Sequence, residues 1–358
     1  MSAADLEKRR IGSLEVSVVG LGCNNFGKNL DSDATADVIY AALDAGITFL
    51  DTADKYGGGK SEEFIGRALQ SRRADAVIAT KFGSPIDDQH RGAKPDYVRR
   101  ACDASLKRLD TDYIDLYWLH RPDSSTPIAD TLGALDELVR AGKVREIGCS
   151  NFSVDQLREA NSAVPPGKAH FVGVQVGYSL LDREPEYGLI PECGRLGLSF
   201  IPFYPLASGL LSGKYRRGKT APRGSRLTTG PYGHLLNDRN LEIVEALIAF
   251  AEPRGHTILE LAISWLLRHD VISSVIAGAT RPDQVRANAA SAGWKDLLIG
   301  HLIAPEKALW AGMMLFGVRL LMRLDLHADP ATEEPPAKVQ GPPYRHEIIR
   351  RLMARQRK

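Results

Sequence analysis

The sequence is poor in cysteine, in net charge and in long apolar runs. Its 358 residues include four cysteines, and the formal net charge is only +2. The cysteines form no CxxC pair and no metal-like spacing, so we expect reduced thiols and no bound metal. The near-neutral charge gives no general electrostatic case for binding nucleic acid. No uninterrupted apolar run is long enough to span a bilayer, and no secretory signal is evident, so we expect a cytoplasmic protein without membrane attachment.

Two common nucleotide-binding motifs are also missing. No GxGxxG follows a strand-like run, and there is no P-loop, so a Rossmann dinucleotide site is not supported. Hydrophobic residues make up 44% of the chain and charged residues 25%, which is ample material for a large core. A (β/α)8 barrel takes about 250 residues, so one barrel with additional segments fits this length better than two domains.

Strand-like and helix-like segments alternate along most of the chain. Residues 9–20 alternate as a hairpin with its turn at Gly12-Ser13, which we expect to cap the closed end of a barrel. Eight β/α units without a second run of strands predict an α/β fold, a parallel (β/α)8 TIM barrel. The strand-like runs lie near 18–22, 47–50, 76–80, 113–119, 144–149, 171–176, 198–203 and 272–277. The helix-like stretches lie near 34–45, 61–70, 96–108, 128–141, 154–162, 185–196, 239–251, 258–268 and 282–291.

Local signals mark several boundaries of these segments. Gly46 and Gly142 stand where helix C-caps are expected, and Ser153 and Asp182 are expected N-caps. Residues 212–237 form a long basic stretch rich in Gly and Pro, and loops of this length are usually functional or disordered.

Four ionisable residues stand at the ends of successive strand-like runs. Asp51 and Tyr56 follow the run ITFL, Lys81 follows AVIAT, and His120 ends IDLYWL. A nearby ammonium favours a phenolate and so lowers the pKa of a tyrosine, while a carboxylate keeps the buried ammonium charged. An imidazole can orient a carbonyl or pass a proton. Together the four suit the delivery of a proton to an oxygen as hydride reaches the adjacent carbon.

Each of these residues also has a structural interpretation. Asp51 in DTAD could cap a turn, Tyr56 before three glycines could be a loop aromatic, Lys81 an ordinary strand-end lysine and His120 a structural histidine. All four at one end of one barrel would require four coincidences, so we favour the catalytic interpretation.

These residues, in DTADKYG, ATKFG and LHRPD, resemble the catalytic tetrad of the aldo-keto reductase family. The resemblance covers roughly residues 9 to 294 and includes GLGCNNFG, GCSNFS, VQVGYSLLDR, PFYPLASGLLSGKY and VIAGATRPDQVRANA. It implies Tyr56 as general acid, Lys81 and Asp51 as the groups that tune it, and His120 as the residue that orients the carbonyl. We therefore expect an aldo-keto reductase barrel over residues 1–294 and a C-terminal extension of unknown role over 295–358.

The resemblance also implies a site for NADPH along the carboxyl ends of the strands. Ser150, Asn151 and Gln175 would bind the nicotinamide carboxamide, and Phe203 would stack on its ring, with Tyr204 as an alternative. The loop from Pro205 through Leu206, Ala207 and Ser208 would hold the phosphates by backbone N–H groups. Further cofactor contacts are expected from Cys23, Asn24, Asp51, Lys214, Arg226, Gly278, Thr280, Arg281, Gln284 and Asn288.

The sequence leaves the function partly open. The leading hypothesis is an NADPH-dependent reductase of small-molecule aldehydes or ketones, with Arg281, Lys214 and Arg226 as candidates for the 2′-phosphate. Arg226 alone is as well explained by solvation of its loop. The alternative is an NADP(H)-binding regulatory subunit, since the same motifs are similar to those of potassium-channel β subunits. Rearrangement at a sugar carbonyl is a third, weaker possibility. A homo-oligomer is possible, because 295–358 contains amphipathic segments that would pack on the barrel or on a partner.

Overall fold

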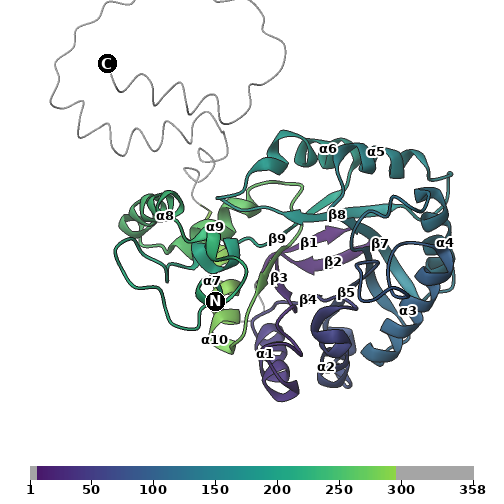
Figure 1. The fold of residues 1–358 in the computed structure, drawn as a ribbon, viewed down its shortest axis with the longest axis horizontal. Coiled ribbons are helices and arrows are strands. Elements are labelled where there is room, and N and C mark those ends of the chain that lie inside the picture. Colours follow the sequence, from purple (N-terminus) through teal and green to yellow (C-terminus); the bar gives the residue numbers. More distant parts are fainter. Residues whose placement is uncertain (1–5, 296–358) are drawn as a thin grey trace, which may run out of the picture. The chain divides into compact units, whose positions relative to one another are not determined.

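The computed structural model describes residues 6–295, and the predicted barrel is confirmed. The expected extension, 295–358, lies outside the described residues apart from Lys295. Eight parallel strands pair in the order β10-β3-β4-β5-β6-β7-β8-β9, and Figure 1 shows them as a ring surrounded by helices. The strands are β3 (Val19–Gly22), β4 (Phe49–Asp51), β5 (Val77–Phe82), β6 (Ile114–Leu119), β7 (Val144–Ser150), β8 (Phe171–Gly177), β9 (Ser199–Phe203) and β10 (Val275–Gly278).

The ring is nearly closed between β9 and β10. Phe200 forms an isolated parallel bridge with Ile272, and its N–H donates to the carbonyl of Val271 at 2.7 Å. The sequence predicted a strand over 272–277, whereas the regular strand begins only at Val275. Residue 272 belongs to this closing bridge, so the alternation seen in the sequence spans two separate pairings.

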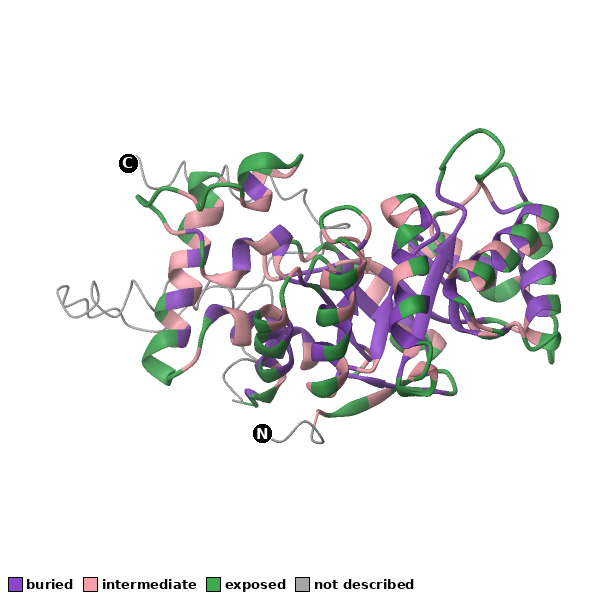
Figure 2. Ribbon diagram, turned by 90° about the horizontal axis from the view of Figure 1, so that it is seen from below, coloured by how far each residue is buried: buried purple, intermediate pink, exposed green. Residues whose placement is uncertain are grey.

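Helices cover the outside of the barrel, and all but the short α7 correspond to expected segments. They are α1 (Ser32–Asp44), α2 (Lys60–Leu69), α3 (Pro95–Leu109), α4 (Ile128–Arg140), α5 (Val154–Ser162), α6 (Leu189–Leu196), α7 (Arg226–Thr229), α8 (Asp238–Ala251), α9 (Ile258–Leu267) and α10 (Pro282–Ala290). Figure 2 shows that the strands in the interior are buried, whereas the surrounding helices are buried on one face and exposed on the other. This one-sided burial is what the helical period of apolar residues predicts.

Most of the predicted caps are confirmed. Ser153 caps α5 with a capping box to Gln156, and Gly46 and Gly142 follow α1 and α4 with φ of 82° and 74°. The expected N-cap at Asp182 is wrong, because its backbone pairs with Ser179 in a tight turn. A 3₁₀ turn follows at Glu184–Tyr187, so α6 begins later than predicted.

The N-terminal hairpin closes the amino end of the barrel, as the sequence predicted. Strands β1 (Lys8–Ile11) and β2 (Leu14–Ser17) pair across the turn at Gly12-Ser13. The hairpin side chains Ile11 and Leu14 are buried in one apolar cluster with Trp118 of β6. This plug leaves the carboxyl ends of the strands as the open face, where a barrel of this kind carries its active site.

The basic stretch 212–237 is better ordered than its composition predicted. It contains the short helix α7, and Tyr215 and Leu227 are buried in an apolar cluster with residues of α8 and α9. Arg216 pairs with Glu245 of α8 at 2.8 Å. The segment is therefore a packed loop that lies after β9.

Candidate active site

The structure brings the four predicted catalytic residues to the carboxyl end of the barrel. Asp51 is the last residue of β4, Lys81 lies near the end of β5, and His120 follows β6 directly. Tyr56 begins the 3₁₀ turn that connects β4 to α2. Parallel strands end at one edge of the sheet, so residues from three consecutive units meet there.

Asp51 and Lys81 form a buried ion pair. Nζ of Lys81 lies 2.5 Å from Oδ2 of Asp51 and 2.7 Å from the carbonyl of Thr52, and the two side chains are 1% and 4% exposed. Oδ1 of Asp51 accepts a hydrogen bond from Nε2 of Gln175 at 2.8 Å. Burial raises the pKa of Asp51, whereas these donors favour its ionised form. Burial would lower the pKa of Lys81, but Asp51 and Tyr56 hold it above its ordinary value, so the ammonium persists.

Tyr56 lies against this ammonium. Nζ of Lys81 is 5.1 Å from the centroid of the Tyr56 ring, and the ring is half-buried. Burial raises the pKa of the phenol, and Lys81 opposes that rise. The lowered pKa expected from the sequence is therefore wrong as a net effect, because desolvation outweighs the ammonium here. A phenol that keeps its proton at neutral pH is still a suitable acid, since it must donate that proton only when an oxyanion forms.

His120 faces Tyr56 as a neutral imidazole. The two ring centroids are 6.0 Å apart, with an interplanar angle of 83°. Burial, followed by the charge of Lys81, lowers the pKa of His120 to about 2. Its Nδ1 is buried without a hydrogen-bond partner among residues 6–295. A neutral imidazole can donate a hydrogen bond to a carbonyl oxygen, but it cannot act as a strong acid near pH 7.

The three predicted carboxamide-binding residues lie together at the ends of β7 and β8. Oγ of Ser150 donates to the carbonyl of Gln175 at 2.8 Å, and Nδ2 of Asn151 donates to Ser150 Oγ at 3.1 Å. Asn151 adopts φ of 61°, which turns the chain sharply after β7. Oε1 of Gln175 accepts no hydrogen bond from the part of the chain that the structure describes. It is therefore available to an amide donor, while the other end of the same side chain holds Asp51.

The aromatic residues at the end of β9 contact each other edge to face, with ring centroids 5.0 Å apart. An added Cβ on Gly177 would lie 3.2 Å from the ring of Phe203, so this ring lies over the neighbouring strand β8. Tyr204 is 37% exposed, and its hydroxyl bonds that of Tyr232 at 2.5 Å. Phe203 therefore lies over β8 and Tyr204 contacts the loop after β9, and the prediction that one of them stacks on the cofactor applies to both rings.

The loop after β9 has a strained backbone. Tyr204, Ala207 and Ser208 have φ of 53°, 46° and 58°, a region that costs about 1–3 kcal/mol for a residue other than glycine. The predicted N–H group of Ala207 donates to the carbonyl of Tyr204 and is not available. The N–H groups of Leu206 and Ser208 find no acceptor within 6–295. Left-handed residues of this kind form concave nests of N–H groups that bind anions.

The three cations expected at the phosphates differ in their partners. Lys214 lies beside this loop, since an added Cβ on Gly209 would be 3.3 Å from its Nζ. Arg226 lies 5.5 Å from the Tyr204 ring centroid. Neither cation pairs with a carboxylate of the described residues. Arg281, by contrast, makes two hydrogen bonds of 2.9 Å to Asp283, so part of its charge is already neutralised.

The expected contacts from the last unit lie at the start of α10. Oε1 of Gln284 accepts from the N–H of Thr280 at 2.8 Å, so this side chain stabilises the turn before the helix. Asn288 is buried on the same helix. Gly278 is exposed at the end of β10, and an added Cβ there would lie 3.8 Å from Oδ1 of Asn24. Gly278, Thr280 and Gln284 therefore lie where β10 passes into α10, and Asn288 is buried one turn further along that helix.

Cys23 is placed differently from the other expected contacts. Its side chain is fully buried, and its Sγ faces the carbonyl of Leu21 at 3.4 Å. Its N–H donates to the carbonyl of Asp51. Cys23 therefore fixes the backbone of β3 beside Asp51, and its thiol does not line the mouth.

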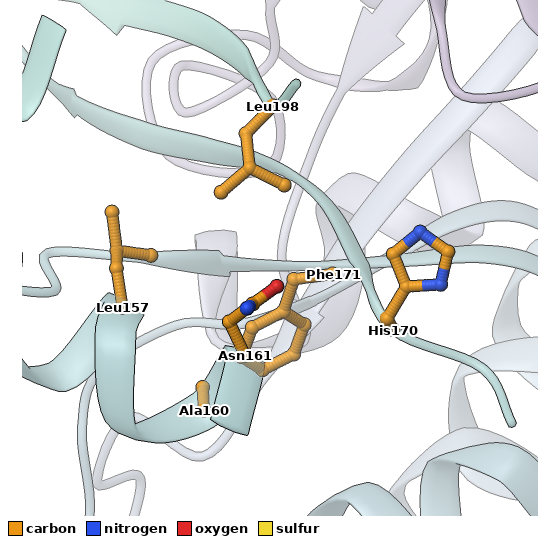
Figure 3. Close-up of a pocket in the computed structure, with 6 residues that line it drawn as sticks. All are labelled: Leu157, Ala160, Asn161, His170, Phe171 and Leu198. Carbon is orange, nitrogen blue, oxygen red and sulfur yellow. The ribbon is translucent and has the colours of Figure 1, made fainter. Parts of the chain in front are cut away.

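Hollows also occur away from the tetrad, and one of about 280 Å³ lies between the end of α4 and the starts of β7 and β8. Among residues 6–295 no group of three or more metal-ligating side chains converges. In the same range no helix is both long and apolar enough to cross a bilayer. The hollow in Figure 3 lies between α5 and the starts of β8 and β9, at the opposite end of the barrel from the tetrad. Its volume is about 10 Å³, which is room for about one water molecule.

Comparison with known proteins identifies the family to which a barrel of this topology belongs. The chain matches the model of the Aldo/keto reductase family over residues 18–295 and belongs to that family. It is 37% identical to probable aldo-keto reductase 1 of Glycine max over 292 residues, which is 78% of this chain and 83% of the relative.

Two further matches cover most of their own chains. A probable voltage-gated potassium channel subunit beta of Arabidopsis thaliana is 35% identical over 77% of this chain and 87% of the relative. The holo form of aldo-keto reductase AKR11C1 from Bacillus halodurans superposes with a TM-score of 0.68 at 31% identity, covering 87% of this chain and 96% of that one. Family membership supports an oxidoreductase acting on small-molecule carbonyls, and the family also contains channel subunits.

Proposed function

We propose that this protein is an NADPH-dependent reductase of aldehydes or ketones. The observation that carries the proposal is the buried Asp51–Lys81 pair beside the Tyr56 phenol at the open end of the barrel. A binding module has no need of a buried ammonium next to a tyrosine, whereas proton transfer uses such a pair to stabilise the phenolate.

The residues around the mouth fit a nicotinamide dinucleotide. Oε1 of Gln175 and Oδ1 of Asn151 suit the N–H groups of a carboxamide, since Nδ2 of Asn151 already donates to His120 and Ser150. The free N–H groups of Leu206 and Ser208 suit phosphate oxygens. Bound reduced nicotinamide would supply the hydride. Asp51 links the two functions, since one carboxylate holds both Gln175 and Lys81.

The chain's own groups then perform the proton chemistry. His120 donates a hydrogen bond to the carbonyl oxygen and holds it near Tyr56. Negative charge grows on that oxygen as the carbon is reduced, and the Tyr56 hydroxyl gives it a proton. Lys81 stabilises the phenolate that remains, and Asp51 keeps Lys81 charged. General acid catalysis of this kind contributes about 10²–10⁴-fold.

The preference for NADPH rests on Arg226 and Lys214. Both are cations without a carboxylate partner among the described residues, and an Arg–phosphate pair is strong when bidentate. We expect Arg226→Ala to weaken NADPH binding more than NADH binding. Arg223→Ala is the matched control, because Arg223 is exposed on the same loop.

The test is to follow oxidation of NADPH and of NADH with a panel of aldehydes and ketones. Turnover with NADPH, and a loss of the cofactor preference in Arg226→Ala only, are the expected results. Equal loss in Arg226→Ala and Arg223→Ala would contradict the assigned phosphate contact.

The second candidate is an NADP(H)-binding regulatory subunit, which the similarity to the plant channel subunit favours. Tight NADPH binding without turnover of any carbonyl would favour this function over catalysis. The intact tetrad is the reason that we place reduction first.

A further inference from the structure

A second buried carboxylate lies directly behind the active site and plays no part in the chemistry above. The side chain of Asp54 is 3% exposed, and its Oδ1 has no hydrogen-bond partner among residues 6–295. The backbone N–H of Asp54 donates to the carbonyl of Lys81 at 3.0 Å. Asp54 also precedes Tyr56 by only two residues. Asp54 is therefore linked by a backbone hydrogen bond to Lys81 and by the chain to Tyr56.

Another buried carboxyl group, that of Glu62, lies near Asp54 and has an ion-pair partner. Glu62 of α2 is fully buried, and its two oxygens accept from Thr80 Oγ1 at 2.5 Å and from Nε of Arg108 at 2.6 Å. Arg108 is the cation of this cluster, and its side chain packs under the turn after Tyr56, 3.0 Å from an added Cβ on Gly59. Arg108 thus lies beside the turn that follows Asp54, while its guanidinium pairs with Glu62.

Two buried carboxylates and one cation favour a single negative charge. Glu62 has both the Thr80 hydroxyl and the Arg108 guanidinium as donors. Asp54 has neither, so its ionised form is disfavoured by burial and then by Glu62, and the pKa of Asp54 rises to about 7. The charged and titratable groups that face Asp54 from its own loop, α2, α3 and β6 are Lys55, Glu62, Tyr97, Arg108 and Tyr117.

We propose that Asp54 is a positioning residue that holds the Tyr56 turn in its catalytic geometry only while its carboxyl group is protonated. Loss of the proton creates a second buried carboxylate, while the guanidinium of Arg108 is already paired with Glu62. Repulsion from Glu62 then displaces the loop of Asp54, which carries Tyr56 with it. The reductase would lose its acid as pH rises, although Tyr56 itself still holds a proton.

The effect of Asp54 on the reaction rate rests on the proposed reductase function. The test therefore also measures hydrogen exchange, which does not depend on catalysis. We would measure the pH dependence of kcat/KM for NADPH-dependent reduction in the wild type and in Asp54→Asn. Hydrogen exchange of residues 53–59 would be measured in both proteins at about pH 6 and about pH 8.5. Asp37→Asn is the matched control, since Asp37 is exposed on α1 and makes no ion pair with another described residue.

We expect kcat/KM of the wild type to fall by about tenfold per pH unit above the pKa of Asp54, as a single essential proton requires. This fall should disappear in Asp54→Asn and persist in Asp37→Asn. The wild type should also lose protection over 53–59 at the higher pH, relative to Asp54→Asn at the same pH. Glu62→Gln should reduce the same fall of kcat/KM at high pH, because it removes the charge that repels the Asp54 carboxylate.

Superimposable pH profiles of the wild type and Asp54→Asn, with equal protection at both pH values, would overturn the proposal. If no carbonyl is reduced at all, the proposed function fails, and the exchange data alone then decide the role of Asp54. If Asp54→Asn does not fold, the same comparison is made with Glu62→Gln. A fall of kcat/KM at high pH equal to that of the wild type would then also contradict the proposal.

Discussion

The buried ion pair allows stability and catalysis to be separated by substitution. In Lys81→Met the ammonium that lies 2.5 Å from Asp51 is lost, and the carboxylate stays buried. Removing one partner of a buried pair costs about 3–5 kcal/mol, because it leaves an uncompensated charge. We expect Lys81→Met to lower the free energy of unfolding by this amount. We also expect it to lower kcat by about 10²–10⁴-fold, since the phenolate loses its cation.

The double variant Asp51→Asn/Lys81→Met removes both charges. It should recover most of the lost stability, because replacing both partners by neutral groups is often nearly neutral. It should recover none of the activity. Stability would be measured by urea unfolding, and activity by NADPH oxidation with an activated aldehyde such as nitrobenzaldehyde.

The control for this experiment is Lys107→Met on the outer face of α3, an exposed lysine that should change neither quantity. A double variant no more stable than Lys81→Met would refute the assignment of the stability loss to an unpaired carboxylate. Full activity in Lys81→Met would refute the role of the ammonium in proton transfer.

Two further outcomes follow from packing and from protonation. Gly148→Ala should destabilise the protein by about 1–3 kcal/mol in urea unfolding, because the new methyl would overlap the Trp118 ring. The control Gly133→Ala, in open space on α4, should be neutral or stabilising. Equal effects of the two substitutions would contradict the close packing of Gly148 against Trp118. His120 has a pKa lowered from 6.5 to about 2, so folding excludes its proton and stability falls as pH drops below about 6.5. His120→Asn should therefore lose less stability than the wild type between about pH 7 and about pH 5, and parallel losses would show that the imidazole titrates normally.

Sequence reasoning predicted the barrel because parallel strands buried on both faces are recognisable as short apolar runs. The eight strands, the hairpin plug and the order of the tetrad all followed from such runs and the residues that end them. Sequence reasoning failed where the start of a helix is set by a turn and not by the periodicity of apolar residues. The Asp182 N-cap and the early start of α6 were both misplaced, since a backbone bridge and a 3₁₀ turn occupy that stretch.

The electrostatics of the site could not be predicted in the same way. The sequence indicated that Lys81 lies near Tyr56, but the net pKa of the phenol depends on how far the ring is desolvated. The cluster of Asp54, Glu62 and Arg108 was missed for a related reason. Its members come from three elements, and the DTAD sequence alone suggests a turn. The pairing of Arg281 with Asp283 likewise required coordinates.

The most direct test of the central claim is the rate of NADPH-dependent aldehyde reduction by Tyr56→Phe, measured together with its affinity for NADPH. The account predicts a fall in kcat of at least about 10²-fold with an unchanged dissociation constant, because only the transferable proton is removed. Tyr187→Phe, at a tyrosine that is 74% exposed, should behave as the wild type. Undiminished turnover in Tyr56→Phe would contradict the claim that this phenol supplies the proton.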